Sequence, residues 1–399
     1  MKQNQSMKTS CTRSDPDLAP ADKPDLTQSF PKVNFNPGPE YGDEHRYFGI
    51  CSSIVKTPGG RLWCGFSSGG LGEGQFNYGV LVTSNDDGRT WSRPQIVFDT
   101  DGDGPIRSDH VVCWVSPAGQ LWIMWSQYPC GLCGPGSSEW AITCGNPDAE
   151  TPEWTAPRKL ADGQNLLNKP IVLSDGSWLF PTGSWHYNSG TSTVRDYDFP
   201  SRPLLSNDGG RTFHLGGPLI ADERPDFDEY MVVERADGTL VLFNRAEGFL
   251  EGTSRNRGRS WSKLQLNAIP HTSARFVFMK LQSGNWLLVK HGNMEKVAGR
   301  TQLTAFLSPD EGRSWTGGLM LDERAVSYPD GFQAWDGRIY VSYERNRHNN
   351  PEILLAVFAE ADVAAGRIVG KDTRLKIQIN KAIGDKAVFQ ADPKNAKYL

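Results

Sequence analysis

Ser84-Asn-Asp-Asp-Gly-Arg-Thr-Trp91 is one of four copies of an eight-residue motif that decides how this chain folds. Each copy reads Ser-x-Asp/Asn-x-Gly-Arg-Ser/Thr-Trp/Phe and leads into a run typical of a strand. The third residue can accept hydrogen bonds from its own turn, and the glycine can take a positive φ. The motif therefore predicts a structural turn, although its residues look catalytic. The other copies span residues 206–213, 254–261 and 308–315, with a degenerate copy at 143–154.

A second repeat is a glycine turn between two strand-like runs, as in Pro58-Gly-Gly-Arg-Leu-Trp63. Successive turn glycines are 59, 57, 62, 46 and 53 residues apart, and each such unit has room for about four short strands. We therefore predict an all-β fold, a six-bladed β-propeller of four-stranded antiparallel blades. The glycines are Gly60, Gly119, Gly176, Gly238, Gly284 and Gly337.

The two repeats divide the chain into two parts. Residues 1–32 form a polar, proline-containing tail that we expect to be disordered, and residues 33–399 form one propeller domain with its C-terminal closing segment. The N-terminus as written has no apolar core and does not read as a signal peptide. The location stays open: periplasmic or secreted if an export signal was trimmed, and cytoplasmic otherwise.

Composition excludes several classes of partner. The 399 residues include 42 Lys and Arg against 46 Asp and Glu, so the net charge is −4. Such a balance gives no basic footprint for a nucleic acid. The sequence has no apolar run of about 18 residues, and we predict no membrane span.

The seven cysteines do not indicate a disulfide framework or a metal centre. Cys51, Cys64, Cys113 and Cys144 fall in apolar runs, where we expect small buried side chains. Cys130-Gly-Leu-Cys133 has the spacing of half a metal site or of a redox pair, but no second pair completes it. We therefore predict no metal and no cofactor.

The eight-residue motifs resemble the Asp boxes of the sialidase superfamily, whose repeats sit on six-bladed β-propellers. The resemblance covers about residues 42–370. It implies that the first and last strands share one blade and so close the ring, which removes exposed sheet edges. Because many Asp-box propellers are not sialidases, the chemistry has to be read from other residues.

One segment resembles the sialidase stretch in which a glutamate activates the nucleophile and an arginine binds the substrate carboxylate. It begins at Asp228-Glu-Tyr and ends at Phe243-Asn-Arg245, on either side of a hairpin. The resemblance gives these roles to Glu229 and Arg245. The alternative is a solvent-exposed ion pair.

Three further positions follow in the order found in sialidases. Gly299-Arg-Thr-Gln-Leu303 matches the segment that supplies a second carboxylate-binding arginine, here Arg300. Ser327-Tyr-Pro-Asp330 matches the segment of the nucleophilic tyrosine, here Tyr328, and Val341-Ser-Tyr-Glu344 ends in the acid that orients an arginine, here Glu344.

The first blades match less closely. Glu73 is the best-placed acid to protonate the leaving group, and the alternative is that its glycine-rich surroundings are only a flexible loop. Asp109 resembles a substrate-contacting aspartate. The first arginine of the family's carboxylate-binding triad is missing from its strand. Arg46 lies a few residues early and is our candidate, with Arg107 and Arg275 as alternatives.

These residue types suit a sugar that carries a carboxylate on its anomeric carbon. A carboxylate nucleophile would be repelled there, whereas a neutral phenol is not, and a tyrosine with a pKa of about 10 needs a base such as Glu229. Arginine binds a carboxylate with two parallel hydrogen bonds and keeps its charge. We therefore expect a retaining exo-glycosidase, with no cofactor, whose partner is a glycan that ends in an acidic sugar such as sialic acid.

Two other functions remain open. A propeller lyase would cleave a uronate-containing glycan by β-elimination, with Tyr328, His291 or His110 removing the proton. A non-catalytic propeller would bind a glycan without forming a product.

Overall fold

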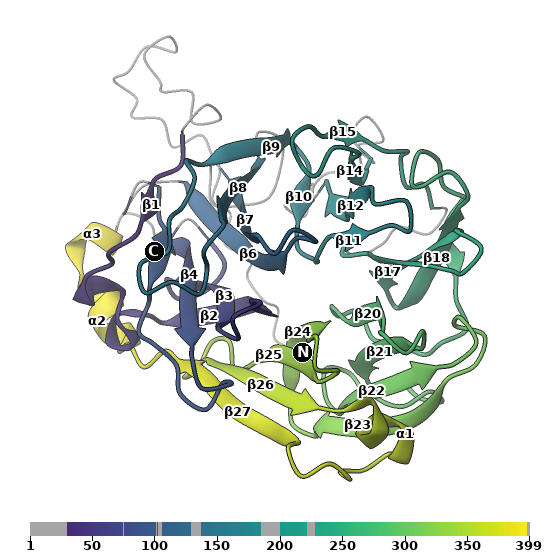
Figure 1. Cartoon of the computed structure of the whole chain (residues 1–399). Helices are drawn as coiled ribbons and strands as arrows, with labels where there is room; N and C mark the ends of the chain where they lie inside the picture. Colours follow the sequence, from purple (N-terminus) through teal and green to yellow (C-terminus); the bar gives the residue numbers. More distant parts are fainter. Residues whose placement is uncertain are drawn as a thin grey trace.

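The computed structural model describes residues 30–74, 76–100, 102, 106–128, 137–184, 200–221 and 228–396. Six antiparallel sheets of four or five strands are arranged as a ring (Figure 1), which confirms the predicted all-β six-bladed propeller. Residues 1–29 of the predicted tail lie outside the described ranges, as do Cys130 and Cys133.

The blades follow one another in chain order, and in the first, second and sixth blades the first strand lies nearest the centre of the ring (Figure 1). The first blade consists of β2 (Phe48–Lys56), β3 (Leu62–Gly69), β4 (Asn77–Ser84) and β5 (Ile96–Phe98), with β1 (Val33–Asn34) added outside β5. The second blade consists of β6 (Arg107–Val115), β7 (Leu121–Tyr128), β8 (Ser138–Cys144) and β9 (Arg158–Asp162). The third consists of β11 (Ile171–Val172), β12 (Trp178–Phe180), β14 (Leu204–Ser206) and β15 (His214–Leu215), with a separate pair of β10 (Asn165–Leu166) and β13 (Thr182–Gly183).

The remaining blades are more regular. The fourth consists of β16 (Met231–Glu234), β17 (Leu240–Ala246), β18 (Gly248–Ser254) and β19 (Gln265–Leu266). The fifth consists of β20 (Val277–Lys280), β21 (Trp286–His291), β22 (Leu303–Ser308) and β23 (Thr316–Asp322). The sixth consists of β24 (Val326–Gln333), β25 (Ile339–Arg345), β26 (Glu352–Phe358) and β27 (Arg374–Lys381).

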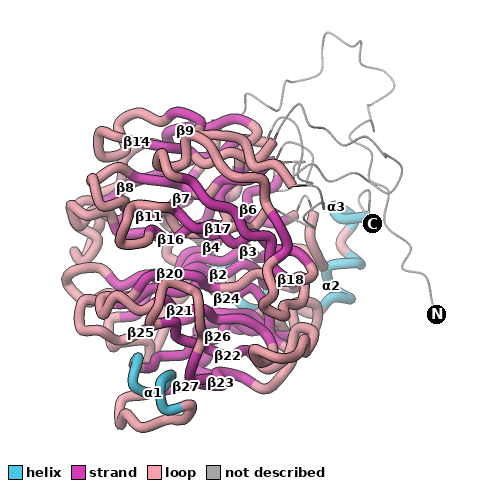
Figure 2. Tube along the Cα trace, turned by 90° about the vertical axis from the view of Figure 1, so that its right-hand side faces the viewer, coloured by secondary structure: helices cyan, strands magenta, loops and turns pink. Residues whose placement is uncertain are grey.

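Short helices lie at the periphery of the ring in both Figure 1 and Figure 2. Two 3₁₀ turns, η3 (Pro39–Tyr41) and η4 (Asp43–His45), precede β2. α1 (Glu360–Ala365) packs on β22 and β23, and α2 (Lys386–Ala391) and α3 (Pro393–Ala396) end the described chain. No helix in the described ranges is long and apolar enough to cross a membrane.

Both sequence repeats are turns within blades. The six predicted turn glycines have φ angles between 77° and 101° and join the first two strands of their blades, which explains the need for glycine. The eight-residue motifs join the third strand to the fourth. In the first copy, Gly88 N donates to Ser84 Oγ at 2.9 Å, and Thr90 N and Oγ1 donate to the Asp86 carboxylate at 2.9 and 2.6 Å. These side chains therefore hold their own turn.

Six of the seven hydrophobic clusters in the described residues lie at the interfaces between neighbouring blades, one at each interface, and the seventh lies around Cys51 and Tyr328. The interface between the sixth and first blades is built like the others, with Tyr340 and Leu355 against Ile54 and Phe66. Cys51, Cys64, Cys113 and Cys144 are buried and free, as predicted. Each blade therefore depends on both neighbours for the burial of its faces.

The prediction of a blade shared between the chain ends is wrong. The sixth blade takes its outer strand β27 from residues that follow β26, so all four of its strands are C-terminal, and the N-terminal β1 pairs with β5 instead. The ring closes through side chains. No strand has to be shared because residues 374–381 already complete the last blade.

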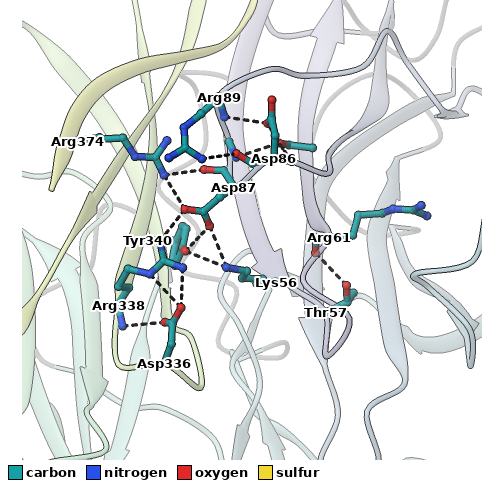
Figure 3. A network of polar contacts seen from close by, with 12 residues as sticks. Lys56, Thr57, Arg61, Asp86, Asp87, Arg89, Asp336, Arg338, Tyr340 and Arg374 are labelled. Atoms are coloured by element: carbon teal, nitrogen blue, oxygen red, sulfur yellow. Dashed lines mark hydrogen bonds and ion pairs between the residues drawn. The ribbon is translucent and has the colours of Figure 1, made fainter. Parts of the chain in front are cut away.

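Asp87 is the centre of the polar part of this closure (Figure 3). Its carboxylate belongs to the eight-residue motif of the first blade and accepts from Lys56 Nζ at 2.9 Å, within the same blade. From the sixth blade it accepts from Tyr340 Oη at 2.6 Å, Arg338 Nη1 at 2.6 Å and Arg374 Nη2 at 2.8 Å. Burial acts to raise the pKa of Asp87, but the hydrogen bonds from Tyr340 and Lys56 outweigh it and lower the pKa to about 2.

We expect Asp87→Asn to lower the free energy of unfolding by about 2 kcal/mol at pH 7, because a carboxyl pKa depressed on folding contributes stability above its unfolded value. This contribution is lost as the pH falls from about 4 to about 2. The difference in the free energy of unfolding between wild type and variant should therefore disappear over this pH range. Urea unfolding across this range measures it, with the exposed Asp372→Asn as the charge-matched control. An Asp87→Asn variant as stable as Asp372→Asn would contradict the role of Asp87.

Candidate active site

Three inner strands carry a bulge at the same place. In β24 the pairing with β25 breaks between Ser327 and Asp330, and Tyr328 within the break has a φ of 50°. The corresponding residues are Cys51 in β2, with a φ of 56°, and His110 in β6, with a φ of 54°. A bulge re-aims side chains, and a positive φ in a tyrosine is costly, so the outlier points to a functional position.

The bulge places Tyr328 against the two residues predicted in the fourth blade. Tyr328 Oη donates to Glu229 Oε1 at 3.3 Å, and Arg245 Nη1 lies 2.8 Å from the same oxygen and 3.2 Å from Tyr328 Oη. All three side chains are buried. The alternative of a solvent-exposed ion pair between Glu229 and Arg245 is therefore wrong, because the pair lies inside the ring.

Three guanidinium groups surround the Tyr328 ring. The Cζ atoms of Arg347, Arg300 and Arg245 lie 5.0, 5.6 and 6.0 Å from its centroid. Burial, followed by Glu229, raises the pKa of Tyr328 well above its ordinary value, and Arg245 opposes them. The phenol is therefore neutral at rest and needs a base, while the cations favour any negative charge that develops on it.

Arg300 lies at the edge of this group and is held by uncharged partners. Its Nη1 donates to Ser327 Oγ at 3.3 Å, and its Nη2 donates to the Ser273 carbonyl at 3.0 Å. Arg300, Ser327, Glu344 and Arg347 line one open cavity of about 320 Å³. Arg300 therefore lies beside an accessible space and is held there by hydroxyl and carbonyl oxygens.

Glu344 holds Arg347, a residue that sequence reasoning missed. Arg347 Nη2 lies 2.5 Å from Glu344 Oε1, and the Cys51 backbone N–H donates to Glu344 Oε2 at 3.2 Å. The resemblance predicts that Glu344 orients an arginine, and the arginine that it contacts in the structure is Arg347, only three residues further along the chain. The Arg-Asn-Arg stretch directly after Glu344 was the available signal.

Glu344 is buried, and this burial raises its pKa to about 7, with the ion pair to Arg347 opposing the rise. The carboxyl group therefore changes its protonation state near neutral pH.

The predicted acids of the first two blades, Glu73 and Asp109, belong to a second group of charged side chains around Arg107. Glu73 is half-exposed, and its carboxylate oxygens lie 3.9 Å from Arg107 Nη2 and 3.7 Å from Arg347 Nη1. Arg107 also pairs with the buried Asp109, and His110 Nε2 lies 3.6 Å from Asp109. Burial acts to raise the pKa of Asp109, but Arg107 and His110 outweigh it, so the pKa is lowered. Glu73 thus connects this group to Arg347.

Two other predicted arginines are engaged elsewhere. Arg46 pairs with Asp43 and donates to Ser68 Oγ at 3.4 Å, with its guanidinium 5.5 Å from the Phe66 centroid. Arg275 donates to carbonyl oxygens and to Asp330 in the middle of the ring. The guanidinium groups of Arg245, Arg300 and Arg347 lie over the Tyr328 ring, whereas those of Arg46 and Arg275 make the other contacts just described.

Two histidines were candidates for the base of a lyase. His291 is buried, and its Nε2 is 2.9 Å from the Val326 carbonyl; burial lowers its pKa to about 4. His110 Nδ1 is 3.0 Å from Tyr128 Oη, and burial lowers its pKa as well. His291 is therefore poorly placed to take a proton from a substrate, whereas His110 lies beside the charged group of Asp109.

No group of three His, Cys, Asp or Glu side chains that could hold a metal occurs in the described part of the chain. Residues 129–136 and 185–199 lie outside that part.

Residues 60–341 match the family model of the BNR repeat-like domain. The chain belongs to this family. None of the curated proteins matches it.

Solved structures share the fold of this BNR propeller at low sequence identity. A protein of unknown function from Dyadobacter fermentans has a TM-score of 0.61 at 16% identity, covering 79% of this chain and 96% of that one. The NanB sialidase from Streptococcus pneumoniae has a TM-score of 0.60 at 14% identity, and the match covers 84% of this chain and 71% of that one. The intramolecular trans-sialidase from Ruminococcus gnavus has a TM-score of 0.63 at 11% identity, and the match covers 82% of this chain and 97% of that one. This chain thus shares its fold with a sialidase and with an intramolecular trans-sialidase.

The raised pKa of Glu344 predicts a pH-dependent stability. The folded state holds a proton that the unfolded state releases between pH 4.5 and 7, so the free energy of unfolding falls as the pH rises through this window. Glu344→Gln removes this pH dependence. Between pH 4.5 and pH 8, the free energy of unfolding of the variant should therefore rise by up to about 3 kcal/mol relative to that of the wild type. Urea unfolding at both pH values measures the change, with the exposed Glu295→Gln as control. The same pH slope in Glu344→Gln as in the wild type would contradict the prediction.

Proposed function

We propose that this protein is a retaining exo-glycosidase that hydrolyses a terminal acidic sugar, sialic acid or a related one, from a glycan. The observation that carries the proposal is the Tyr328 hydroxyl, which donates to Glu229 while three guanidinium groups surround its ring. A buried phenol beside a carboxylate and several fixed cations suits an anionic substrate better than a neutral one. The sialidases among the proteins of this fold support the same substrate class.

In the first step, Tyr328 Oη attacks the anomeric carbon while Glu229 takes the phenol proton. The bond from that carbon to the aglycone oxygen breaks, and Glu73 donates a proton to this oxygen. The sugar is then covalently bound to Tyr328. In the second step, Glu73 takes a proton from a water molecule that attacks the anomeric carbon, and the Tyr328 oxygen leaves and recovers its proton from Glu229. The two substitutions together retain the configuration.

The remaining charged residues bind the substrate. Arg245 and Arg300 face the Tyr328 ring, and we assign them to the sugar carboxylate, for which the planar guanidinium is well suited. We assign Asp109, whose pKa is lowered by Arg107 in spite of its burial, as the acceptor for a sugar hydroxyl or amide. Glu229 acts as the base because its Oε1 already accepts from the phenol.

We expect Tyr328→Phe to lower kcat on an aryl α-sialoside by about a thousandfold or more, while the affinity for the substrate changes little, because only the nucleophilic oxygen is lost. Release of the aryl alcohol measures turnover. Tyr343→Phe is the matched control, since Tyr343 is a buried tyrosine of the same blade whose hydroxyl lies 3.2 Å from Asp322.

Full activity in Tyr328→Phe would exclude tyrosine catalysis. A product with the ultraviolet absorbance of an unsaturated uronate, released from a uronate-containing oligosaccharide, would favour the lyase function instead. Binding of both sugars without any product would favour a glycan-binding propeller.

Glu73→Gln should show a loss that depends on the leaving group. We expect kcat/KM to fall about 10²- to 10⁴-fold on a sialylated oligosaccharide, because its alkoxide needs a proton to leave. The loss should be much smaller on a nitrophenyl sialoside, whose leaving group needs little protonation. Equal losses on both substrates, measured as initial rates, would assign the acid role to another residue.

A further inference from the structure

We infer that Arg347 binds the carboxylate of the substrate and completes the set begun by Arg245 and Arg300, with Glu344 as its positioning residue. The inference rests on the proposed function and adds to it the residue that replaces the arginine missing from the first blade. It is carried by the position of Arg347 relative to Tyr328, Glu344 and Arg300.

Arg347 is nearer to the Tyr328 ring than either predicted arginine. Its Cζ lies 5.0 Å from the ring centroid, against 5.6 Å for Arg300 and 6.0 Å for Arg245. Arg347 and Arg300 also line the same open cavity of about 320 Å³, together with Ser327. This volume falls at the lower end of small-molecule sites, which suits part of one sugar. The two guanidinium groups can therefore contact one anion.

Two carboxylates hold the Arg347 guanidinium, one closely and one at a longer distance. Nη2 is held by Glu344 at 2.5 Å, whereas Nη1 lies 3.7 Å from Glu73 Oε1, which is beyond hydrogen-bond distance. An arginine that one carboxylate already fixes closely loses little side-chain freedom when it binds a ligand, and the longer contact to the half-exposed Glu73 is the one that a ligand carboxylate would replace. Glu344 is itself fixed by the Cys51 backbone N–H, so its position depends on the first blade.

The structure also shows why the first blade does not supply this cation. The residue of β2 that corresponds to Tyr328 is Cys51, whose side chain packs with Tyr328 in a small apolar cluster. Arg46, the nearby arginine of that blade, is held by Asp43 and Ser68. The charge beside Glu344 therefore comes from the turn that follows β25 in the sixth blade.

The alternative is that Arg347 only neutralises Glu344. A comparison of an acid with its ester separates the two roles, because a structural ion pair would not distinguish between them. We propose titration calorimetry of the wild type, Arg347→Gln and Arg347→Lys with 2,3-dehydro-2-deoxy-N-acetylneuraminic acid and with its methyl ester. Arg313→Gln, at an exposed turn of the fifth blade, removes the same charge and serves as control. Circular dichroism checks that each variant is folded.

If Arg347 binds the carboxylate, Arg347→Gln weakens binding of the acid about 10- to 100-fold and changes binding of the ester less than threefold. Arg347→Lys keeps part of the affinity, since it keeps the charge but not the planar fork, and Arg313→Gln binds both ligands like the wild type. Equal binding of the acid by wild type and Arg347→Gln, or an equal loss for acid and ester, overturns the inference while leaving the proposed function intact. A wild type that binds neither ligand and cleaves no sialoside overturns both.

Discussion

A single buried carboxylate, that of Asp330, connects four of the six blades in the middle of the ring. Asp330 belongs to β24, accepts from the Ile54 backbone N–H of the first blade at 3.0 Å, and pairs with Arg275 at 3.1 Å and with Lys169 of the third blade. Arg275, which enters the fifth blade, donates further to the Ser52 and Leu167 carbonyl oxygens. Breaking such a pair would leave uncompensated charge in the interior, so the inner strands are held in a fixed relative position.

This constraint explains how an unfavourable tyrosine conformation is kept. Tyr328 lies between Ser327, which accepts from Arg300, and Asp330, which is held from three other blades. The bulge therefore has fixed ends, and the positive φ of Tyr328 is maintained by contacts that do not involve its own side chain. The same fixed ends keep the hydroxyl within reach of Glu229, which is located on a different blade. The contacts of Asp330 and Ser327 thus maintain both the strained backbone of Tyr328 and the position of its hydroxyl group.

The sequence predicts the fold well because the fold is repetitive and local. A glycine turn or an Asp box needs only residues a few positions apart, and the six glycine turns define the ring. The meeting of Tyr328 with Glu229 and Arg245 followed from a resemblance in which the order of residues is kept across three blades. Arg347 could not be found in this way, since its position depends on a loop conformation. The closure through Asp87 could not be found either, because it joins side chains more than 250 positions apart.

The site also shows that the position of a charge matters more than the strand that supplies it. An anion at Tyr328 needs several cations around it, and each cation inside a protein needs a partner that offsets its desolvation. Arg245 has Glu229, and Arg347 has Glu344, so the carboxylates fix where the arginines can lie. The cation that pairs with Glu344 comes from the turn directly after β25, in the same blade. The overall charge of −4 carries no trace of this arrangement, since the local cations and carboxylates nearly cancel.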